Sequence, residues 1–192
     1  MDGATSEATE GLAEAQARLW ARLAELGIRT RTVEHPPVFT VAEAKALRGE
    51  LPGGHCKSLF LRDKRRHWLL VALEDQRIDL KALRAPLGAG NLSFASPERL
   101  QAMLGVTPGS VTPFALINAR GEDGGREPTL TVVLDRAMLA FDPLNYHPLR
   151  NDQTTAIAPA DLVRFIRACG YEPVALDLAA EPPQPAALPQ WP

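Results

Sequence analysis

The fold is decided by the stretch Gly53–Asp63, which reads Gly-Gly-His-Cys-Lys-Ser-Leu-Phe-Leu-Arg-Asp. The two glycines permit a tight turn because they carry no Cβ, and the Leu-Phe-Leu run predicts a buried strand. Lys57 therefore lies where a strand leaves a loop, a common position for residues that carry out chemistry. A solvated lysine at a strand end is the alternative interpretation, because lysine side chains are seldom buried.

The rest of the chain mixes short helices and strands. Apolar residues at helical spacing, Thr40 and Ser96 as helix caps, and β-branched runs indicate these elements. The expected helices span 11–26, 41–47, 80–85, 97–104 and 159–168, and the expected strands span 29–34, 58–63, 67–73, 92–94, 114–118, 130–135, 138–141 and 173–178. Because strands and helices do not alternate regularly, this order predicts an α+β fold with a mixed, largely antiparallel sheet.

Length and composition indicate one globular domain. The chain has 192 residues, of which 45% are hydrophobic and 23% are charged, as is usual for such a domain. We expect a flexible N-terminus at 1–10, the domain at 11–178, and a Pro-rich C-terminal tail at 179–192 that is extended and mobile. No apolar run reaches the roughly twenty residues of a membrane span, and no signal peptide is evident. We therefore expect a cytoplasmic protein without a membrane partner.

The net charge of -2 excludes a basic field over the whole surface. A local basic patch remains at the expected turn between the strands 58–63 and 67–73. Its members are Arg62, Lys64, Arg65 and Arg66. Such a patch can bind phosphates, and a solvated hairpin tip is the alternative.

Several kinds of catalytic site find no support in the sequence. No Gly-x-Ser-x-Gly elbow and no phosphate-binding loop is present. The four histidines and two cysteines lack metal-ligand spacing, so we expect no metal and no cofactor. Cys56 could act as a thiol nucleophile, although a small packing residue is the commoner role for a cysteine in this position.

Three further motifs accompany Lys57. They are the Gly-x-x-x-Pro loop Gly109-Ser110-Val111-Thr112-Pro113, the segment Asp142–Asn151 (Asp-Pro-Leu-Asn-Tyr-His-Pro-Leu-Arg-Asn), and the segment Glu34–Thr40 (Glu-His-Pro-Pro-Val-Phe-Thr). In this order, over roughly residues 15 to 178, the chain resembles the YbaK/ProX superfamily of aminoacyl-tRNA deacylases. The likeness is greatest to freestanding prolyl-tRNA editing proteins of the ProXp-ala (PrdX) type.

The resemblance implies a curved, partly barrel-like sheet surrounded by helices, with a cleft between the lysine strand and the glycine-proline loop. It assigns a catalytic role to Lys57, which we expect to act by positioning and electrostatics. An ester hydrolase without a side-chain nucleophile needs donors to the oxyanion, and the backbone at Gly109 can supply them. The pocket residues that it implies are Phe39, Thr40, Ser58, Ser110, Val111, Thr112, Pro113, His147 and Asn151. The alternatives are a rigid turn for the loop, core packing for Phe39, and hydrogen bonds to buried backbone groups for His147 and Asn151.

The resemblance further implies an enzyme that hydrolyses the ester of mischarged tRNA(Pro), with Ala-tRNA(Pro) as the expected substrate. A synthetase site built for proline cannot strongly exclude the smaller alanine, so a second sieve is needed. The expected partners are the tRNA(Pro) acceptor end and prolyl-tRNA synthetase. Ser58 stands where the alanine-editing branch typically has asparagine, which leaves serine, cysteine or 2-aminobutyrate as alternative substrates. A non-catalytic tRNA- or synthetase-binding module is the alternative from another class.

Overall fold

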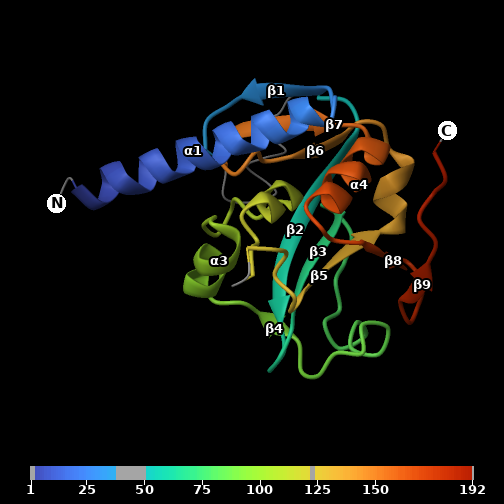
Figure 1. Cartoon of the computed structure of the whole chain (residues 1–192). Coiled ribbons are helices and arrows are strands. Elements are labelled where there is room, and N and C mark those ends of the chain that lie inside the picture. The colour runs from blue at the N-terminus through green and yellow to red at the C-terminus, as the bar shows by residue number, and fades with distance from the viewer. Residues whose placement is uncertain (1–2, 38–50, 122–123, 192) are drawn as a thin grey trace.

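The computed structural model of the chain describes residues 3–37, 51–121 and 124–191 (Figure 1). The expected helix at 41–47, and with it Phe39 and Thr40, lies outside the described residues. The elements are, in chain order, α1 (Gly3–Glu25), β1 (Thr30–Glu34), β2 (Gly54–Arg62), β3 (His67–Leu73), β4 (Ser93–Phe94), α3 (Pro97–Leu104), the 3-10 helix η1 (Pro113–Ile117), β5 (Leu130–Asp135), the 3-10 helix η2 (Arg136–Ala140), β6 (Leu144–Tyr146), β7 (Gln153–Ile157), α4 (Pro159–Ala168), β8 (Val174–Asp177) and β9 (Gln184–Ala186).

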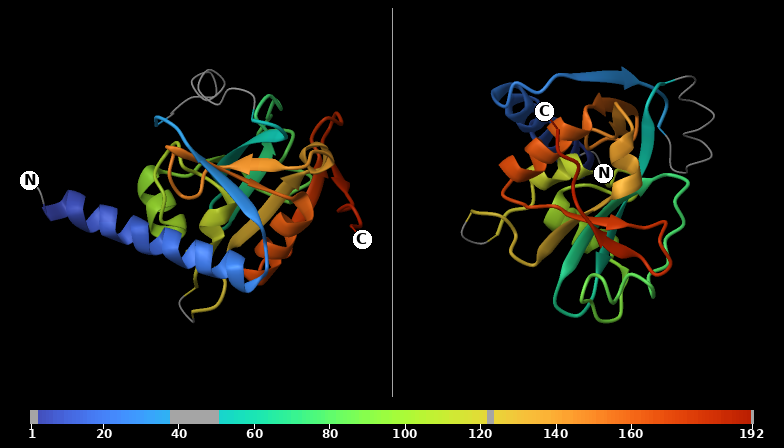
Figure 2. Two further views of the ribbon diagram at one scale, coloured as in Figure 1. Left: turned by 90° about the horizontal axis from the view of Figure 1, so that it is seen from above. Right: turned by 90° about the vertical axis from the view of Figure 1, so that its right-hand side faces the viewer.

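The strands of the described residues form one sheet in the order β1-β7-β6-β2-β3-β5-β8-β9, with β4 paired to β2. Parallel pairs join β2 to β6, β3 to β5, and β5 to β8, whereas the other five pairs are antiparallel. The sheet is strongly curved and does not close (Figures 1 and 2). The expected α+β class with a mixed, largely antiparallel, curved sheet is confirmed.

Each face of the sheet buries its own apolar cluster. The larger core lies between the sheet and the helices α1, α3, α4 and η1, and includes Leu19, Leu104, Phe114 and Phe165. The smaller core lies on the opposite face under the segment 74–92. Its fully buried large side chains include Leu61, Trp68, Leu70 and Leu83. Successive residues of β2 therefore point into different cores.

The ends of helix α3 follow the signals in the sequence. The Ser96 hydroxyl accepts a hydrogen bond from the Arg99 N–H at 3.3 Å, and Pro97 occupies the first turn. Gly105 ends the helix in the left-handed region at φ 64°, where a residue with a Cβ is strained. The expected cap and helix are confirmed.

Three segments differ from their expected secondary structure. Residues 80–88 form turns, which the Asp79 carboxylate initiates by accepting the Lys81 N–H at 2.8 Å. The expected strands at 114–118 and 138–141 are the 3-10 helices η1 and η2. Side chains decide both, because Thr112 and Asp135 accept N–H groups of the first turns and so favour a helical start over an extended chain.

Regular secondary structure is present near both ends of the described residues. Helix α1 begins at Gly3, so residues 3–10 are helical. In the expected Pro-rich tail, β9 pairs with β8, and Leu188 and Trp191 pack against the larger core. Figure 2 shows this segment running along one side of the molecule.

Candidate active site

Strand β2 carries Lys57 and is open along part of one edge. This edge, which faces away from β3, pairs with β6 at Gly54–His55 and with β4 at Leu61–Arg62. The Gly54 N–H donates to Pro143 O at 2.8 Å, and Phe60 O accepts from the Ala95 N–H at 2.9 Å. Because backbone groups of alternate residues point the same way, those of Cys56 and Ser58 face this edge, where no described strand pairs with them.

The glycines before Lys57 allow β2 to approach the Asp-Pro-Leu segment closely. Gly53 has φ 100°, and a Cβ there would lie 2.1 Å from Pro143 O. A Cβ on Gly54 would lie 2.9 Å from Phe141. The glycine pair is therefore required to bring two sequence motifs together at the start of β2.

The Lys57 ammonium lies on the smaller-core face of β2. Its Nζ donates to Gln76 O at 2.5 Å, and the Gln76 carboxamide donates to Leu178 O at 3.0 Å. Partial burial lowers the pKa of Lys57, and the nearby carboxylates of Asp75 and Glu74 oppose that shift. Gln76 also lines a hollow of 910 Å³ between residues 75–83 and 178–183, so the ammonium lies beside this hollow.

Ser58 and the Gly109–Pro113 loop lie toward the other face. Ser58 pairs with Val71 of the larger core, and Val111 packs against the same core. Within the loop, Ser110, Thr112 and Pro113 are buried, whereas Gly109 is exposed with φ 90°. The structure thus places the loop and Ser58 toward one face and Lys57 toward the other. The open edge of β2 is the place that both faces share.

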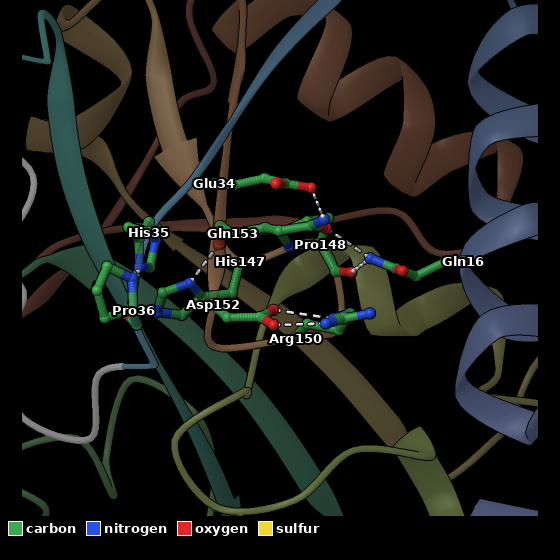
Figure 3. A network of polar contacts seen from close by, with 9 residues as sticks. All are labelled: Gln16, Glu34, His35, Pro36, His147, Pro148, Arg150, Asp152 and Gln153. Atoms are coloured by element: carbon green, nitrogen blue, oxygen red, sulfur yellow. Dashed lines mark hydrogen bonds and ion pairs between the residues drawn. The ribbon is translucent and has the colours of Figure 1, made fainter. Parts of the chain in front are cut away.

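The Glu-His-Pro-Pro and Asp-Pro-Leu motifs meet through two histidines (Figure 3). The ring centroids of His35 and His147 are 6.0 Å apart. His35 Nε2 is 2.9 Å from Thr154 Oγ1, and His147 Nδ1 donates to Gln153 O at 2.8 Å. Since a carbonyl oxygen only accepts, neutral His147 carries its hydrogen on Nδ1 and leaves Nε2 as an acceptor.

The surroundings of His147 favour its neutral form. Burial lowers its pKa, and the charge of His35 adds to that shift. The hydrogen bond to Gln153 and the Asp152 carboxylate oppose it. Asn151 lies half-buried in the turn between β6 and β7. The position suits His147 for accepting a hydrogen bond from a polar group of a ligand.

Helix α1 supports this turn through residues that the sequence analysis did not select. Gln16 Nε2 donates to Pro148 O at 2.7 Å and to Gln153 Oε1 at 3.0 Å. Within the turn, Arg150 Nε donates to Asp152 Oδ1 at 2.8 Å. No local pattern reveals Gln16, because its partners lie more than 130 residues away in the chain.

The basic residues of the β2–β3 hairpin are exposed, as expected, but lie far from Lys57. The Asp63 carboxylate organises the turn by accepting the N–H groups of Gly90, Arg65 and Arg66, which hold the pKa of Asp63 at about 2. Five residues separate Lys57 from Arg62, or about 16 Å along a strand. The patch of Arg62, Lys64, Arg65 and Arg66 therefore lies at the opposite end of β2 (Figure 1).

The cysteine next to Lys57 is poorly suited to nucleophilic attack. Burial raises the pKa of Cys56 to about 12, and a hydrogen bond with Tyr146 offsets only part of this shift. A thiol with such a pKa is protonated at neutral pH. Over the described ranges, no three His, Cys, Asp or Glu side chains are grouped as a metal ion would require.

No helix in the part of the chain that the structure describes is long and apolar enough to cross a membrane.

Comparison with known proteins shows the family. Residues 35–165 match the aminoacyl-tRNA editing domain, and this range contains Lys57, the glycine-proline loop and His147. The chain belongs to this family, which confirms the resemblance read from the motifs. Its class of function is therefore aminoacyl-tRNA editing.

The matches to individual relatives cover nearly the whole length of each relative. The chain is 39% identical over 171 residues to prolyl-tRNA synthetase associated domain-containing protein 1 of Bos taurus, covering 86% of this chain and 96% of the relative. It is 36% identical over 167 residues to the prolyl-tRNA editing protein ProX of Acetoanaerobium sticklandii, covering 86% and 98%. A crystal structure described as a candidate trans-editing enzyme for prolyl tRNA synthetase has a TM-score of 0.62 at 22% identity, covering 85% and 96%, and supports the fold.

Proposed function

We propose that this protein hydrolyses the aminoacyl ester of mischarged tRNA(Pro), with Ala-tRNA(Pro) as its substrate. The observation that carries the proposal is the edge of β2 that no described strand pairs with between β6 and β4, on a strand that carries Lys57 and Ser58. Relatives named for prolyl-tRNA editing support the choice of tRNA. A partnership with prolyl-tRNA synthetase is proposed on the name of the Bos taurus relative.

The proposed reaction needs no side-chain nucleophile. Water attacks the ester carbonyl carbon, and the bond to the ribose oxygen breaks to release alanine and tRNA. Backbone N–H groups at Gly109 stabilise the oxyanion of the tetrahedral intermediate. The Lys57 ammonium binds a phosphate of the acceptor end or polarises the ester. These roles agree with the raised pKa of Cys56, which disfavours a thiolate mechanism.

The pocket is proposed to select by size. Ser110, Val111, Thr112 and Pro113 form its wall in this proposal, and burial of three of them gives that wall rigidity. Ser58, His147 and Asn151 are proposed to bind the aminoacyl group and the terminal ribose. Phe39 and Thr40 complete the proposed pocket on the strength of the sequence. A pocket that accepts alanine and excludes proline supplies the second sieve that a synthetase lacks.

The test is hydrolysis of tRNA(Pro) carrying alanine, serine, cysteine, 2-aminobutyrate or proline, with Ala-tRNA(Ala) as the control for tRNA identity. We expect Ala-tRNA(Pro) to be cleaved fastest and Pro-tRNA(Pro) to remain intact. Faster cleavage of the seryl, cysteinyl or 2-aminobutyryl ester would instead assign the pocket to that amino acid, consistent with Ser58. Binding of tRNA(Pro) without hydrolysis of any ester would identify a binding module and refute the proposal.

A further inference from the structure

The main-chain groups of Ser58 face the edge of β2 that no described strand pairs with. On this side of the strand, the Gly54 N–H donates to Pro143 O at 2.8 Å. Phe60 O accepts from the Ala95 N–H on the same side at 2.9 Å. Ser58 is an even number of residues from both Gly54 and Phe60, and backbone groups of alternate residues point the same way. Its N–H and its C=O therefore both point to this edge.

The ladder that β4 begins along this edge stops just before Ser58. Strand β4 runs antiparallel to β2, and the bond between Ala95 and Phe60 continues the pairing by one step. Two residues after Ala95, the chain reaches Pro97, which lies in the first turn of α3. Proline has no N–H to donate, so the chain turns away without pairing with Ser58. The next position of this antiparallel ladder is the one opposite Ser58.

The unpaired stretch is short, and its length limits what can bind there. The pairs with β6 reach His55, and the contact with the β4 segment begins at Phe60. Residues 56–59 between them extend over about 13 Å, and of these Cys56 and Ser58 face the edge. A peptide that adds to a sheet as a strand forms several consecutive pairs. A single aminoacyl group needs one pair and fits this length better.

We propose that Ser58 binds the aminoacyl group of the substrate as if that group were one residue of an antiparallel strand. The Ser58 N–H donates to the ester carbonyl oxygen, and the Ser58 C=O accepts from the α-ammonium. This inference rests on the proposed function, and it identifies the ligand as an aminoacyl ester with a free α-ammonium. When water adds to the carbonyl carbon, the Ser58 N–H stabilises the oxyanion together with the backbone at Gly109.

The antiparallel direction brings both ends of the ester to groups that are proposed to bind them. Paired residues project their side chains to the same face, so the methyl group of an L-alanyl ester points with the Ser58 side chain. Val111 of the glycine-proline loop packs against the core on that face. The ribose oxygen follows the acyl carbon and lies opposite Lys57, the proposed ligand of the acceptor end. A parallel direction would carry the ribose toward Leu59 and away from Lys57.

The first test removes the Ser58 N–H. Ser58→Pro deletes this group and breaks no bond to β3, because the N–H faces the open edge, where proline is tolerated. Ser58→Ala keeps the N–H and loses only the hydroxyl. We expect Ser58→Pro to hydrolyse L-alanyl-tRNA(Pro) at least tenfold more slowly than Ser58→Ala in single turnovers, as loss of an oxyanion donor predicts. Thermal midpoints and affinity for uncharged tRNA(Pro) check the fold. An amide-to-ester replacement at Ser58 removes the same N–H without a proline ring and decides the question if Ser58→Pro unfolds.

The second test changes the substrate. Lactyl-tRNA(Pro) carries a hydroxyl in place of the α-ammonium, and D-alanyl-tRNA(Pro) directs its methyl group to the opposite face. Each enzymatic rate is divided by the spontaneous hydrolysis rate of the same ester, because the ammonium itself activates the ester. We expect both ratios to be at least tenfold below that of the L-alanyl ester, since a hydrogen bond from a charged donor is lost in one and the side-chain contact in the other.

Equal rates for Ser58→Ala and a folded variant without the Ser58 N–H would overturn the inference. So would an equal ratio for either substrate analogue and the L-alanyl ester. These results would leave the proposed function standing, because the wild type still hydrolyses its ester. Hydrolysis of no ester by the wild type would refute the proposed function and, with it, the pairing with Ser58.

Discussion

Lys57 is the only lysine in strand β2. Its ammonium donates one hydrogen bond, to the carbonyl oxygen of Gln76. An ammonium has three donors, so this bond leaves it able to bind an ester or phosphate oxygen. In the proposed mechanism, its position on the face opposite the glycine-proline loop requires the ammonium to act across the open edge of the strand. The chemistry then depends on the reach of the side chain as well as on its charge.

We predict that Lys57→Ala slows single-turnover deacylation at least tenfold, about 1.4 kcal/mol of barrier. Lys57→Arg keeps the charge but alters the geometry, and should recover only part of the rate. Lys81→Ala removes an exposed lysine from the turn segment and is the control. Circular dichroism checks the fold, and wild-type rates in a folded Lys57→Ala protein would remove Lys57 from the mechanism.

Two histidines should make the protein less stable in weak acid. Burial lowers the pKa values of both His147 and His67 below 6.5 in the folded state. The unfolded chain therefore binds protons first, so stability is complete above about pH 6.5 and falls as pH drops toward the lowered folded values. We expect the thermal midpoint to fall between about pH 7.5 and about pH 5.5. In His147→Gln, the decrease should be smaller, and an equal decrease would show that His147 does not contribute.

At the scale of elements, the turn between β6 and β7 is an instructive case because a helix from the other end of the chain supports it. Gln16 of α1 donates two hydrogen bonds to this turn, one of them to the Gln153 side chain. The Gln153 carbonyl in turn accepts the hydrogen bond from His147 Nδ1 (Figure 3). The orientation of the imidazole thus depends on helix packing as well as on its own motif.

We predict that Gln16→Ala destabilises the fold by about 1–2 kcal/mol, as expected for two partly buried hydrogen bonds, and lowers the ratio of alanyl to prolyl ester hydrolysis. Gln16→Glu keeps the size but cannot donate to Pro148 O, so it should act like the alanine variant. Gln101→Ala, an exposed glutamine on α3, is the matched control. If Gln16→Ala loses stability but keeps the hydrolysis ratio, the contact supports the fold without orienting His147.

For the whole molecule, the C-terminal segment closes one end of the sheet. Strand β9 extends the sheet beyond β8, and Leu188 and Trp191 return to the larger core. Residues 178–183 also form one side of the hollow beside Lys57 and its partner Gln76. The segment therefore packs against the sheet and the larger core, and it lines the hollow near the proposed site.

Removal of residues 181–192 should lower the thermal midpoint by about 5–10 °C, since a few kcal/mol of apolar burial is lost from a domain of this size. Trp191→Ala in the full chain should reproduce part of that decrease. Pro185→Ala changes an exposed residue of β9 and should have little effect. Identical midpoints for the full and shortened chains would show that the segment is detached in solution.

The sequence by itself determined the α+β class, helix α3 with its cap, the β2–β3 hairpin and the family. These depend on local features: periodicity, capping residues, glycine turns, and motifs read in order along the chain. It could not predict strands β6, β7 and β9, because short strands of mixed polarity form only where a partner strand satisfies their backbone groups.

Only the tertiary structure determined which face of the sheet each side chain occupies and which distant residues lie close together. The alternation of β2 sends Lys57 to one core and Ser58 to the other, which depends on the register with β3. Among the described strands, pairing with β6 and β4 leaves the edge of β2 between them open, and helix packing brings Gln16 to the histidine turn. These relations join residues far apart in the chain, and only packing of the whole sheet and its helices determines which of them meet.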